Sequence, residues 1–286
     1  MNALERALRS LDGLSVGDAF GELFFYISPE YATLKDLPGR MWRWTDDTHM
    51  ALSIVEVLKK FGRVDQDALA RAFAARYMDE PNRGYGGGAR RLLARIAAGS
   101  DWREESPRLF GSGSCGNGAA MRIAPLGAFF ADDPARAADE ARLSAMVTHA
   151  HPEGAAGAVA VAVAAALAAG SPRPVGRSFI EAVAAHVPDG LTRHGLLRAL
   201  EIPPGALALA ARILGTGNQV TAQDTVPFCI WIAAHHADSF EDALWQTVRG
   251  LGDRDTTCAI VGGIVSLSAP GIPAEWLRRR EPLPQI

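Results

Sequence analysis

Segments with apolar residues three and four positions apart recur along most of this 286-residue chain. Such spacing places the apolar side chains on one face of a helix. Alternating runs of Val, Ile and Thr bounded by turns, which would indicate strands, are nearly absent. The pattern predicts a compact all-α fold, with helices at roughly 2–14, 46–61, 65–78, 86–98, 118–130, 133–147, 153–170, 177–186, 205–214, 222–236, 240–250 and 255–267.

The organisation of the chain indicates a single domain over residues 1–286. A hydrophobic content of 48% is enough to bury a substantial core, and no linker, charge block or shift in composition marks a boundary. The formal charge is −3, and Lys and Arg are scattered, so a nucleic-acid-binding surface is not indicated. We expect a monomer.

Cysteine usage and hydropathy bear on the compartment. Cys115, Cys229 and Cys258 form no CxxC pair, which favours a reducing cytoplasm over a disulfide framework. Residues 1–9 lack the apolar stretch of a signal peptide. The most hydrophobic run, 155–169, is shorter than the ~20 residues that span a bilayer, and an evenly apolar helix belongs in a core. We expect a soluble, cytoplasmic protein without a membrane partner.

Two short acidic motifs, Thr45-Asp46-Asp47-Thr48 and Asp253-Arg254-Asp255-Thr256, each begin an expected helix. Thr45 is placed to cap the first of these helices, and acidic residues in a first turn complement the helix dipole. Four carboxylates and several hydroxyls are nevertheless more acceptors than two caps require. If the fold brings the motifs together, a cation is needed, and oxygen ligands favour Mg²⁺, Mn²⁺ or Ca²⁺ over zinc. The motifs predict a metal-dependent enzyme.

A glycine-rich run, Gly111-Ser112-Gly113-Ser114-Cys115-Gly116-Asn117-Gly118, contains a literal G-x-G-x-x-G. The dinucleotide-binding interpretation requires a preceding strand, and residues 102–108 do not form one; a P-loop would need a following Lys-Ser/Thr. A loop that aims backbone N–H groups at an anion remains, and so does a plain interhelical turn. Ser114 and Asn117 favour the first, because their side chains can orient a phosphate or a sugar.

Two further segments carry polar residues. In Thr148-His149-Ala150-His151-Pro152-Glu153 no tetrahedral zinc set is apparent. We interpret His151 as a local hydrogen-bonding group and leave His149 open. The segment Gly17-Asp18-Ala19-Phe20-Gly21-Glu22 closes the first expected helix, with glycines suited to a helix end or a close backbone approach. Asp18 and Glu22 are by default exposed acids.

In this order, the motifs resemble those of the ADP-ribosylglycohydrolase family, which includes the dinitrogenase reductase-activating glycohydrolase and the vertebrate ADP-ribosylhydrolases. The resemblance runs from about residue 10 to about residue 268. It rests on Gly17-Asp18-Ala19-x-Gly21, Trp44-Thr45-Asp46-Asp47-Thr48, Gly116-Asn117-Gly118-Ala119-x-Met121-Arg122, Thr148-His149-x-His151-Pro152-Glu153 and Gly252-Asp253-x-Asp255-Thr256-Thr257.

The resemblance implies an all-α domain with two Mg²⁺ ions, or Mn²⁺ in their place, at the centre of a cleft. The implied metal ligands are Thr45, Asp46, Asp47, Asp253, Asp255 and Thr256. The implied contacts to the diphosphate and distal ribose of the substrate are Gly113, Ser114, Cys115, Gly116 and Asn117, and His149 matches a family histidine that contacts ADP-ribose. The implied reaction is hydrolysis of the glycosidic bond between ADP-ribose and a modified acceptor.

The chain departs from the family pattern at two places. Many relatives carry a glutamate on a flap a few residues beyond the Gly-Asp-Ala motif; here Glu22 follows Gly21 at once and Glu30 comes later, in an irregular segment from 22 to 40. Arg254 replaces a small residue within the second acidic motif.

Asp47 or Asp255 is expected to polarise the water, with Glu22 as a further candidate general acid or base.

The sequence leaves two other classes of function open. One is a non-catalytic ADP-ribose-binding or crystallin-like relative, and the completeness of both acidic motifs counts against it. The other is a metal-dependent phosphohydrolase acting on a diphosphate. The acceptor also stays open: an arginine, serine or other side chain of a protein, a small molecule such as O-acetyl-ADP-ribose, or a modified nucleic acid.

Overall fold

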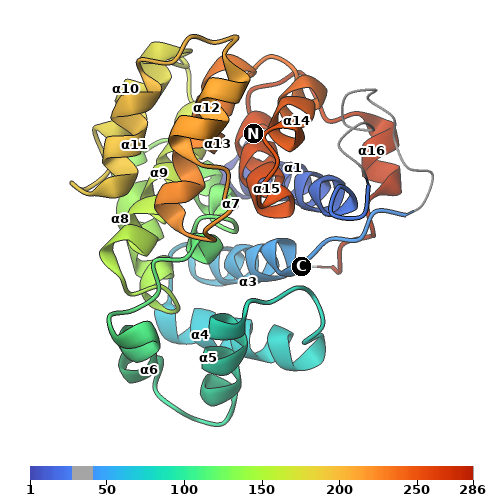
Figure 1. The fold of residues 1–286 in the computed structure, drawn as a ribbon. Helices are drawn as coiled ribbons and strands as arrows, with labels where there is room; N and C mark the ends of the chain where they lie inside the picture. Colours follow the sequence, from blue (N-terminus) through green and yellow to red (C-terminus); the bar gives the residue numbers. More distant parts are fainter. Residues whose placement is uncertain (28–40, 286) are drawn as a thin grey trace.

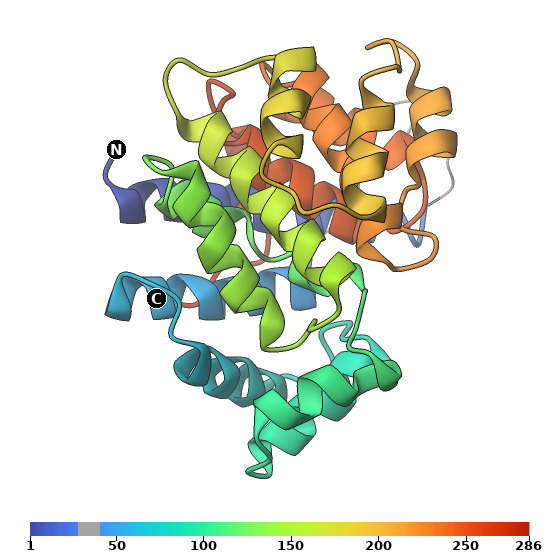
Figure 2. The ribbon, with the colours of Figure 1, turned by 90° about the vertical axis from the view of Figure 1, so that its left-hand side faces the viewer.

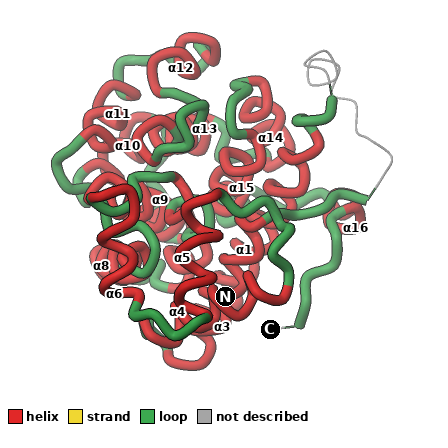
Figure 3. Tube along the Cα trace, turned by 60° about the horizontal axis from the view of Figure 1, so that its bottom comes forward, coloured by secondary structure: helices red, strands yellow, loops and turns green. Residues whose placement is uncertain are grey.

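The computed structural model describes residues 1–27 and 41–285. Within these residues the chain consists of helices joined by loops and forms no strand, only two isolated bridges, Trp42 to Arg280 and Gly116 to Thr221. Figure 3 shows this helix-and-loop composition along the described part of the trace. The predicted all-α class is confirmed.

The helices are α1 (Ala3–Leu23), α3 (Asp46–Phe61), α4 (Gln66–Asp79), α5 (Gly87–Ala97), α6 (Trp102–Arg108), α7 (Ala124–Phe129), α8 (Pro134–Met146), α9 (Pro152–Ala169), α10 (Arg177–Ala184), α11 (Leu191–Ala199), α12 (Leu207–Leu214), α13 (Val226–His235), α14 (Phe240–Arg249), α15 (Arg254–Val265) and α16 (Ala274–Arg279). Short 3-10 turns are η1 (Leu109–Gly111), η2 (Asn117–Ala119) and η3 (Ala222–Asp224).

Helices α1 and α15 pack against each other at the centre of the molecule, with α3 beside α1 (Figure 1). Glycines make the contact between α1 and α15 close, since a Cβ atom on Gly17 would overlap the carbonyl of Cys258. A Cβ on Gly21 would lie 2.8 Å from the Cα of Asp255. The absence of side chains at these positions lets the two backbones touch. This contact fixes the start of α15 against α1, and α3, which carries the other acidic motif, also packs on α1.

Helix α9 forms the apolar centre of the other half of the protein. It lies along α8 (Figure 2) and also packs against α7, where Gly127 allows contact with the Ala162 backbone. Its 18 residues are long and apolar enough for a membrane span by length and composition alone, but 78% of them are buried inside the protein. The evenly apolar sequence is thus explained by burial on all sides, and the predicted core helix is confirmed.

Several predicted helix boundaries are wrong. Helix α1 continues to Leu23, so the glycines near its end provide close packing and do not terminate it. The segment 118–130 is not one helix, because it holds η2 and then α7, which starts anew with Pro125 near its N-terminus. Helices α6, α11 and α16 were not predicted; each has fewer than ten residues, and such short segments carry too few apolar positions to establish a period.

Candidate functional site

The first acidic motif begins α3 and lies inside the protein. Thr45 precedes the first turn, and Asp46 and Asp47 form that turn with buried side chains. The Thr45 side chain makes no capping hydrogen bond. Its hydroxyl lies 2.9 Å from Asp18 Oδ1 and 3.1 Å from Asp47 Oδ2. Thr45 occupies the N-cap position as expected, but the expected capping hydrogen bond is absent, because the hydroxyl lies between two carboxyl groups.

Asp18 is a site residue that the sequence interpretation missed. It is fully buried on α1 and accepts hydrogen bonds from the backbone N–H groups of Thr45 (2.9 Å) and Thr48 (3.1 Å). The Thr48 hydroxyl donates a further bond of 2.5 Å to it. These bonds attach the start of α3 to α1, so the default reading of an exposed acid is wrong here. The available signal was the four-residue spacing of Gly17 and Gly21, which marks the tightly packed face of α1.

The second acidic motif begins α15. Asp253 precedes the helix without a side-chain cap, and its Oδ2 accepts a hydrogen bond of 2.7 Å from the side-chain amide of Asn117. Asp255 lies in the first turn, where its Oδ1 accepts from the backbone N–H of Thr256 at 2.8 Å. Because α15 touches α1 and Asp18 ties α1 to α3, both acidic motifs reach the same region of the protein.

Burial and mutual repulsion make these carboxyl groups hard to ionise. Burial, opposed by the hydrogen bonds from the start of α3, raises the pKa of Asp18 to about 6. Burial and the neighbouring charge of Asp18 raise the pKa of Asp46 to about 7. For Asp47, burial followed by repulsion from Asp255 raises the pKa well above its usual value. Burial and then repulsion from Asp253 do the same to the pKa of Asp255.

The oxygen atoms of the two acidic motifs are the kind of ligand that hard divalent cations prefer, but their side chains are not arranged as in a metal site. Asp47 Oδ1 is buried and has no hydrogen-bond partner within the described residues, as expected of an oxygen reserved for another ligand. The surrounding groups are carboxylates and hydroxyls, which Mg²⁺ and Mn²⁺ prefer. Across 1–27 and 41–285, however, no three His, Cys, Asp or Glu side chains converge closely enough to hold an ion. The dinuclear cleft stays a prediction.

The glycine-rich run forms a loop that faces the acidic motifs. Gly113 has a φ of +84°, and a Cβ there would lie 2.5 Å from the backbone nitrogen of His151. The loop thus packs directly on the turn that precedes α9. Ser114 Oγ accepts from the Gly116 N–H at 3.1 Å, whereas the N–H groups of Ser114 and Cys115 have no partner in the described part of the chain. These two donors are available to a ligand.

Asn117 connects the loop to the second acidic motif. Besides Asp253, its side-chain amide donates to the Thr225 hydroxyl at 3.1 Å. Asn117 is 3% exposed, so both bonds lie in the interior. The backbone N–H of Asn117 donates to the Val220 carbonyl at 3.2 Å. The residue therefore fixes the relative positions of three segments, and its side chain is used within the protein.

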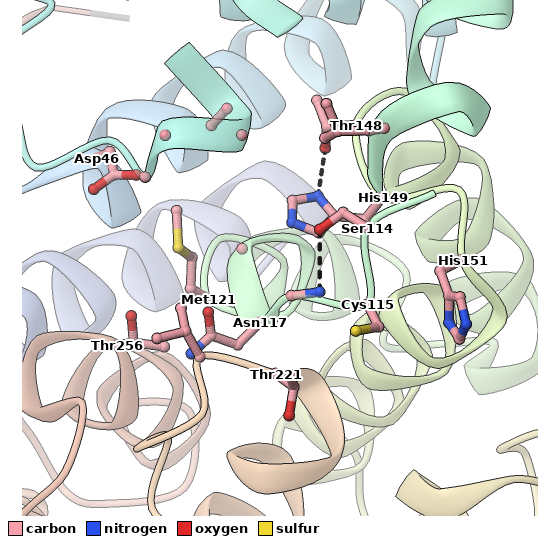
Figure 4. A pocket seen from close by; sticks show the side chains of 18 of the residues that line it. Asp46, Ser114, Cys115, Asn117, Met121, Thr148, His149, His151, Thr221 and Thr256 are labelled. Carbon is pink, nitrogen blue, oxygen red and sulfur yellow. Dashed lines mark hydrogen bonds between the residues drawn. The ribbon is translucent and has the colours of Figure 1, made fainter. Parts of the chain in front are cut away.

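The two histidines of the third segment have different roles. His151 precedes α9, and its Nδ1 accepts from the Glu153 N–H at 3.1 Å, which confirms the predicted local hydrogen-bonding group. His149 is buried beside the loop, 2.7 Å from the Thr148 hydroxyl through Nδ1 (Figure 4). Burial, together with the positive charge of Arg122, lowers the pKa of His149 to about 3. Its imidazole is neutral at physiological pH.

A cavity of about 660 Å³ joins these segments. Figure 4 shows side chains from both acidic motifs, the loop and the His149 turn around it. The expected site residues that line it are Asp46, Asp47, Asp253, Asp255, Thr256, Gly113, Ser114, Cys115, Gly116, Asn117 and His149. The volume is in the range of small-molecule binding pockets.

The remaining expected site residues, Glu22 and Thr45, line a second cavity of about 510 Å³. Gly84 and Asp255 line both cavities, so the two cavities meet at the carboxyl groups of the two acidic motifs, called the acidic cluster below. Glu22 lies within α1, not on an irregular loop, and the Tyr26 hydroxyl donates to its carboxylate at 3.1 Å. Glu30, and the part of the expected flap from 28 to 40, lie outside the described residues.

Sequence reasoning also missed the rim of the larger cavity. Phe110 and Val220 both line it, both are largely exposed, and both have positive φ angles of 55° and 54°. Left-handed backbone is uncommon for a bulky residue, and strain of this kind concentrates at binding sites. No motif or periodicity distinguishes these residues in the sequence.

Comparison with known proteins gives the same family for the whole chain. The model of the ADP-ribosylglycohydrolase family matches residues 1–285. An uncharacterised protein of Archaeoglobus fulgidus is 30% identical over 278 residues, which cover 93% of this chain and 88% of the relative. ADP-ribosylhydrolase ARH3 of Gallus gallus is 36% identical over 150 residues, covering 51% of this chain and only 40% of that relative.

A solved structure, described as an ADP-ribosylglycohydrolase-related protein complex, superposes with a TM-score of 0.64 at 26% identity. The superposition covers 98% of this chain and 93% of the other. The family resemblance and the hydrolase class inferred from the motifs are thereby confirmed. This chain belongs to the ADP-ribosylglycohydrolase family.

Proposed function

We propose that this protein is a Mg²⁺-dependent ADP-ribosyl hydrolase. It would cleave the glycosidic bond between ADP-ribose and a modified acceptor and release ADP-ribose. One observation carries the proposal: a single cavity of about 660 Å³ is lined both by a loop whose Ser114 and Cys115 N–H groups have no partner among the described residues and by the carboxyl groups of the two acidic motifs, of which Asp46 and Asp47 are buried. The loop suits a diphosphate, and the carboxyl groups suit a sugar held through cations.

The diphosphate would lie against the loop. The N–H groups of Ser114 and Cys115, which have no partner among the described residues, would donate to phosphate oxygens. Backbone donors bind anions without adding a charge of their own. The base would lie at the rim, where the exposed side chains of Phe110 and Val220 provide apolar surface. This orientation directs the proximal ribose toward the acidic cluster.

Two divalent cations would be held by the two acidic motifs, through Thr45, Asp46, Asp47, Asp253, Asp255 and Thr256. When bound, they supply positive charge that orients the ribose hydroxyls and a reacting water. Asp18 is not part of this set, because both of its oxygens already accept hydrogen bonds from the start of α3. Its role is to keep Thr45 and the first turn of α3 in place.

The scissile bond would lie where the two cavities meet. Asp255 lines both of them, so its carboxyl group borders the space on either side of the bond. Asp47 and Asp255 are the candidates for polarising the water, and Glu22 borders the second cavity, where the leaving group would depart. The acceptor, a modified protein side chain or a small molecule, would occupy this second cavity.

Product analysis tests the proposal. Purified protein with Mg²⁺ is incubated with a panel of substrates ADP-ribosylated on arginine, on serine or on acetate, and the products are separated chromatographically. Free ADP-ribose is expected from at least one substrate, whereas AMP would indicate diphosphate cleavage and contradict the proposal. Asp255→Asn is expected to abolish release, and Asp238→Asn, which alters a surface carboxylate whose side chain is 94% exposed, to leave it unchanged.

A further inference from the structure

A chain of three polar side chains leads from the core to the wall of the larger cavity. Arg122, fully buried after the glycine loop, donates from Nη2 to the Thr148 hydroxyl oxygen at 2.8 Å. The same oxygen lies 2.7 Å from Nδ1 of His149. Figure 4 shows the contact between Thr148 and the imidazole. Arg122 does not line the cavity and Thr148 lines it beside His149, and the proposed function gives neither residue a role.

The direction of these hydrogen bonds follows from the chemistry of the groups. A guanidinium only donates, so Thr148 Oγ1 is the acceptor of the bond from Arg122. Thr148 is 2% exposed, and its hydroxyl proton has no other acceptor than His149 Nδ1 in the described part of the chain. Leaving a buried hydroxyl proton unpaired is unfavourable. The hydroxyl therefore donates to Nδ1, which must carry a lone pair.

A neutral imidazole with a lone pair on Nδ1 carries its proton on Nε2. The ring is neutral because burial and the charge of Arg122 lower the pKa of His149. Burial lowers the pKa of Arg122 itself to about 9, so the guanidinium remains charged at neutral pH. Arg122, which stays charged in the physiological pH range, thus orients the Thr148 hydroxyl, and this hydroxyl sets the tautomer of His149.

Nε2 of His149 faces the glycine loop and the cavity. Cβ atoms on Gly116 and Gly118 would lie 3.3 Å and 2.9 Å from it, so the absence of side chains there leaves room for the ring. Nε2 has no hydrogen-bond partner among residues 1–27 and 41–285. The unpaired N–H groups of Ser114 and Cys115 belong to the same loop. This wall therefore offers a group of donors that lack an acceptor.

We infer that Arg122 and Thr148 are positioning residues that hold His149 as its Nε2–H tautomer, so that His149 donates a hydrogen bond to a diphosphate oxygen. The inference rests on the proposed function for the identity of the ligand, but not for the tautomer. It excludes His149 as a general base in the reaction. It also defines the diphosphate subsite as one built from neutral donors.

Nuclear magnetic resonance of ligand-free protein labelled with ¹⁵N in histidine measures the tautomer directly. Wild-type His149, assigned by its loss in His149→Gln, is expected to show an unprotonated Nδ1 and a protonated Nε2 at neutral pH. Thr148→Val, which removes only the hydroxyl, is expected to give a mixture of tautomers, and Thr148→Ser to restore the single form. A wild-type Nδ1–H tautomer, or an unchanged tautomer in folded Thr148→Val, would overturn the inference.

The affinity for ADP-ribose tests the donor role. A glutamine amide reaches the position of Nε2, whereas an asparagine amide reaches only that of Nδ1. Titration calorimetry is expected to show His149→Gln within a few-fold of wild type and His149→Asn about tenfold or more weaker, in line with the loss of a hydrogen bond to a charged group. Binding by the asparagine variant equal to that by the glutamine variant would overturn the donor role.

The two measurements separate this inference from the proposed function. If wild-type protein failed to bind ADP-ribose, the proposed function would be wrong, and the tautomer in ligand-free protein would still support or overturn the positioning role of Arg122 and Thr148. If ADP-ribose bound and the Nδ1–H form were found, the inference alone would fail.

Discussion

The side-chain amide of Asn117 donates a hydrogen bond of 2.7 Å to the carboxylate of Asp253, and so joins the glycine loop to the second acidic motif. Both groups lie at the same cavity. The bond supplies the carboxylate with a neutral donor. The loop and the acidic cluster are therefore directly connected, although Asn117 and Asp253 are 136 residues apart in the sequence.

Removing this connection should lower activity more than stability. Asn117→Ala leaves Asp253 without its donor, and the loss of a hydrogen bond to a charged group corresponds to about tenfold or more in kcat/KM. ADP-ribose release by the purified variant measures the effect. Asn218→Ala is the matched control, because Asn218 is exposed and, among the described residues, its amide donates only to the Thr216 hydroxyl. Equal losses in both variants would contradict a specific role of the Asn117–Asp253 bond.

Activity should depend on a divalent cation. The proposed ligands are carboxylates and hydroxyls, so release of ADP-ribose is expected to stop in excess EDTA and to return with Mg²⁺ or Mn²⁺. Asp253→Ala and Asp255→Ala should remove most metal binding by calorimetry, while the helix content by circular dichroism stays close to that of wild type. Full activity in the presence of EDTA would exclude the metal role.

The metal-free protein should lose stability as the pH rises above about 6.5. Folding raises the pKa of Asp46 from 3.8 to about 7, and burial and like charges also raise the pKa values of Asp47 and Asp255 well above 3.8. In this range the folded protein keeps protons that the unfolded chain has released, so the free energy of unfolding falls with increasing pH. Below pH 6.5 the lowered pKa values of His49, about 4, and His149, about 3, have the opposite sign and mask the effect.

Thermal unfolding of metal-free protein in a pH series measures this dependence. The Tm is expected to decrease by a few degrees between about pH 6.5 and pH 8, and Mg²⁺ should reverse the decrease by neutralising the carboxylates. Asp47→Asn removes one of the groups and should make the dependence shallower. A Tm that rises over the same interval in the metal-free protein would show that the carboxyl groups are not held protonated by the fold.

A side chain on Gly116 should weaken ligand binding with little effect on folding. Gly116 has ordinary backbone angles, and a Cβ would meet Ser114 Oγ at 3.1 Å and His149 Nε2 at 3.3 Å. Gly116→Val is therefore expected to fold and to bind ADP-ribose at least tenfold more weakly, because it displaces two groups of the cavity wall. Gly271→Ala, at a position with open space around it, is the control. Unchanged affinity in folded Gly116→Val would contradict the placement of the diphosphate.

Glu22 should affect turnover and not affinity. It borders the second cavity together with Asp255, on the side proposed for the leaving group. Glu22→Gln keeps the shape and removes the charge, so kcat should fall strongly while the affinity for ADP-ribose stays within a few-fold of wild type. Glu241→Gln alters an exposed acid on α14 and serves as the control. An unchanged kcat would make Glu22 a structural residue at the end of α1.

The sequence predicts the helical class and the residues around the cavity better than it predicts how they are held. The start of α3 and of α15 follows from local acidic and apolar patterns, and these depend on neighbours in the sequence. The burial of Asp18 does not, because it results from the contact of α1 with two other helices. Any single carboxylate on a helix looks exposed until its packing partners are known.

The rim of the cavity illustrates a second limit of local patterns. The left-handed backbone at Phe110 and Val220 arises where the chain changes direction, and residue type gives no indication of it, since bulky side chains disfavour such angles. The position of the Thr45 hydroxyl between the carboxyl groups of Asp18 and Asp47 also cannot be predicted from local sequence. Thr in this position usually caps a helix, and only the approach of Asp18 from another helix changes its partner.

The glycine contact between α1 and α15 brings the two backbones together with no side chain between them. With Gly17 directly against the Cys258 carbonyl, the separation of the two helix axes is set by backbone atoms and not by the size or rotamer of any side chain. An added methyl group at this position would therefore push Asp18 and the second acidic motif apart without altering a single carboxylate. Substitutions of residues of the second cavity such as Met41 or Asn82, by contrast, would change the shape of the proposed acceptor site while this spacing stays the same. The spacing on which the proposed catalytic geometry depends is thus encoded in Gly17 and Gly21 of α1, which line neither cavity.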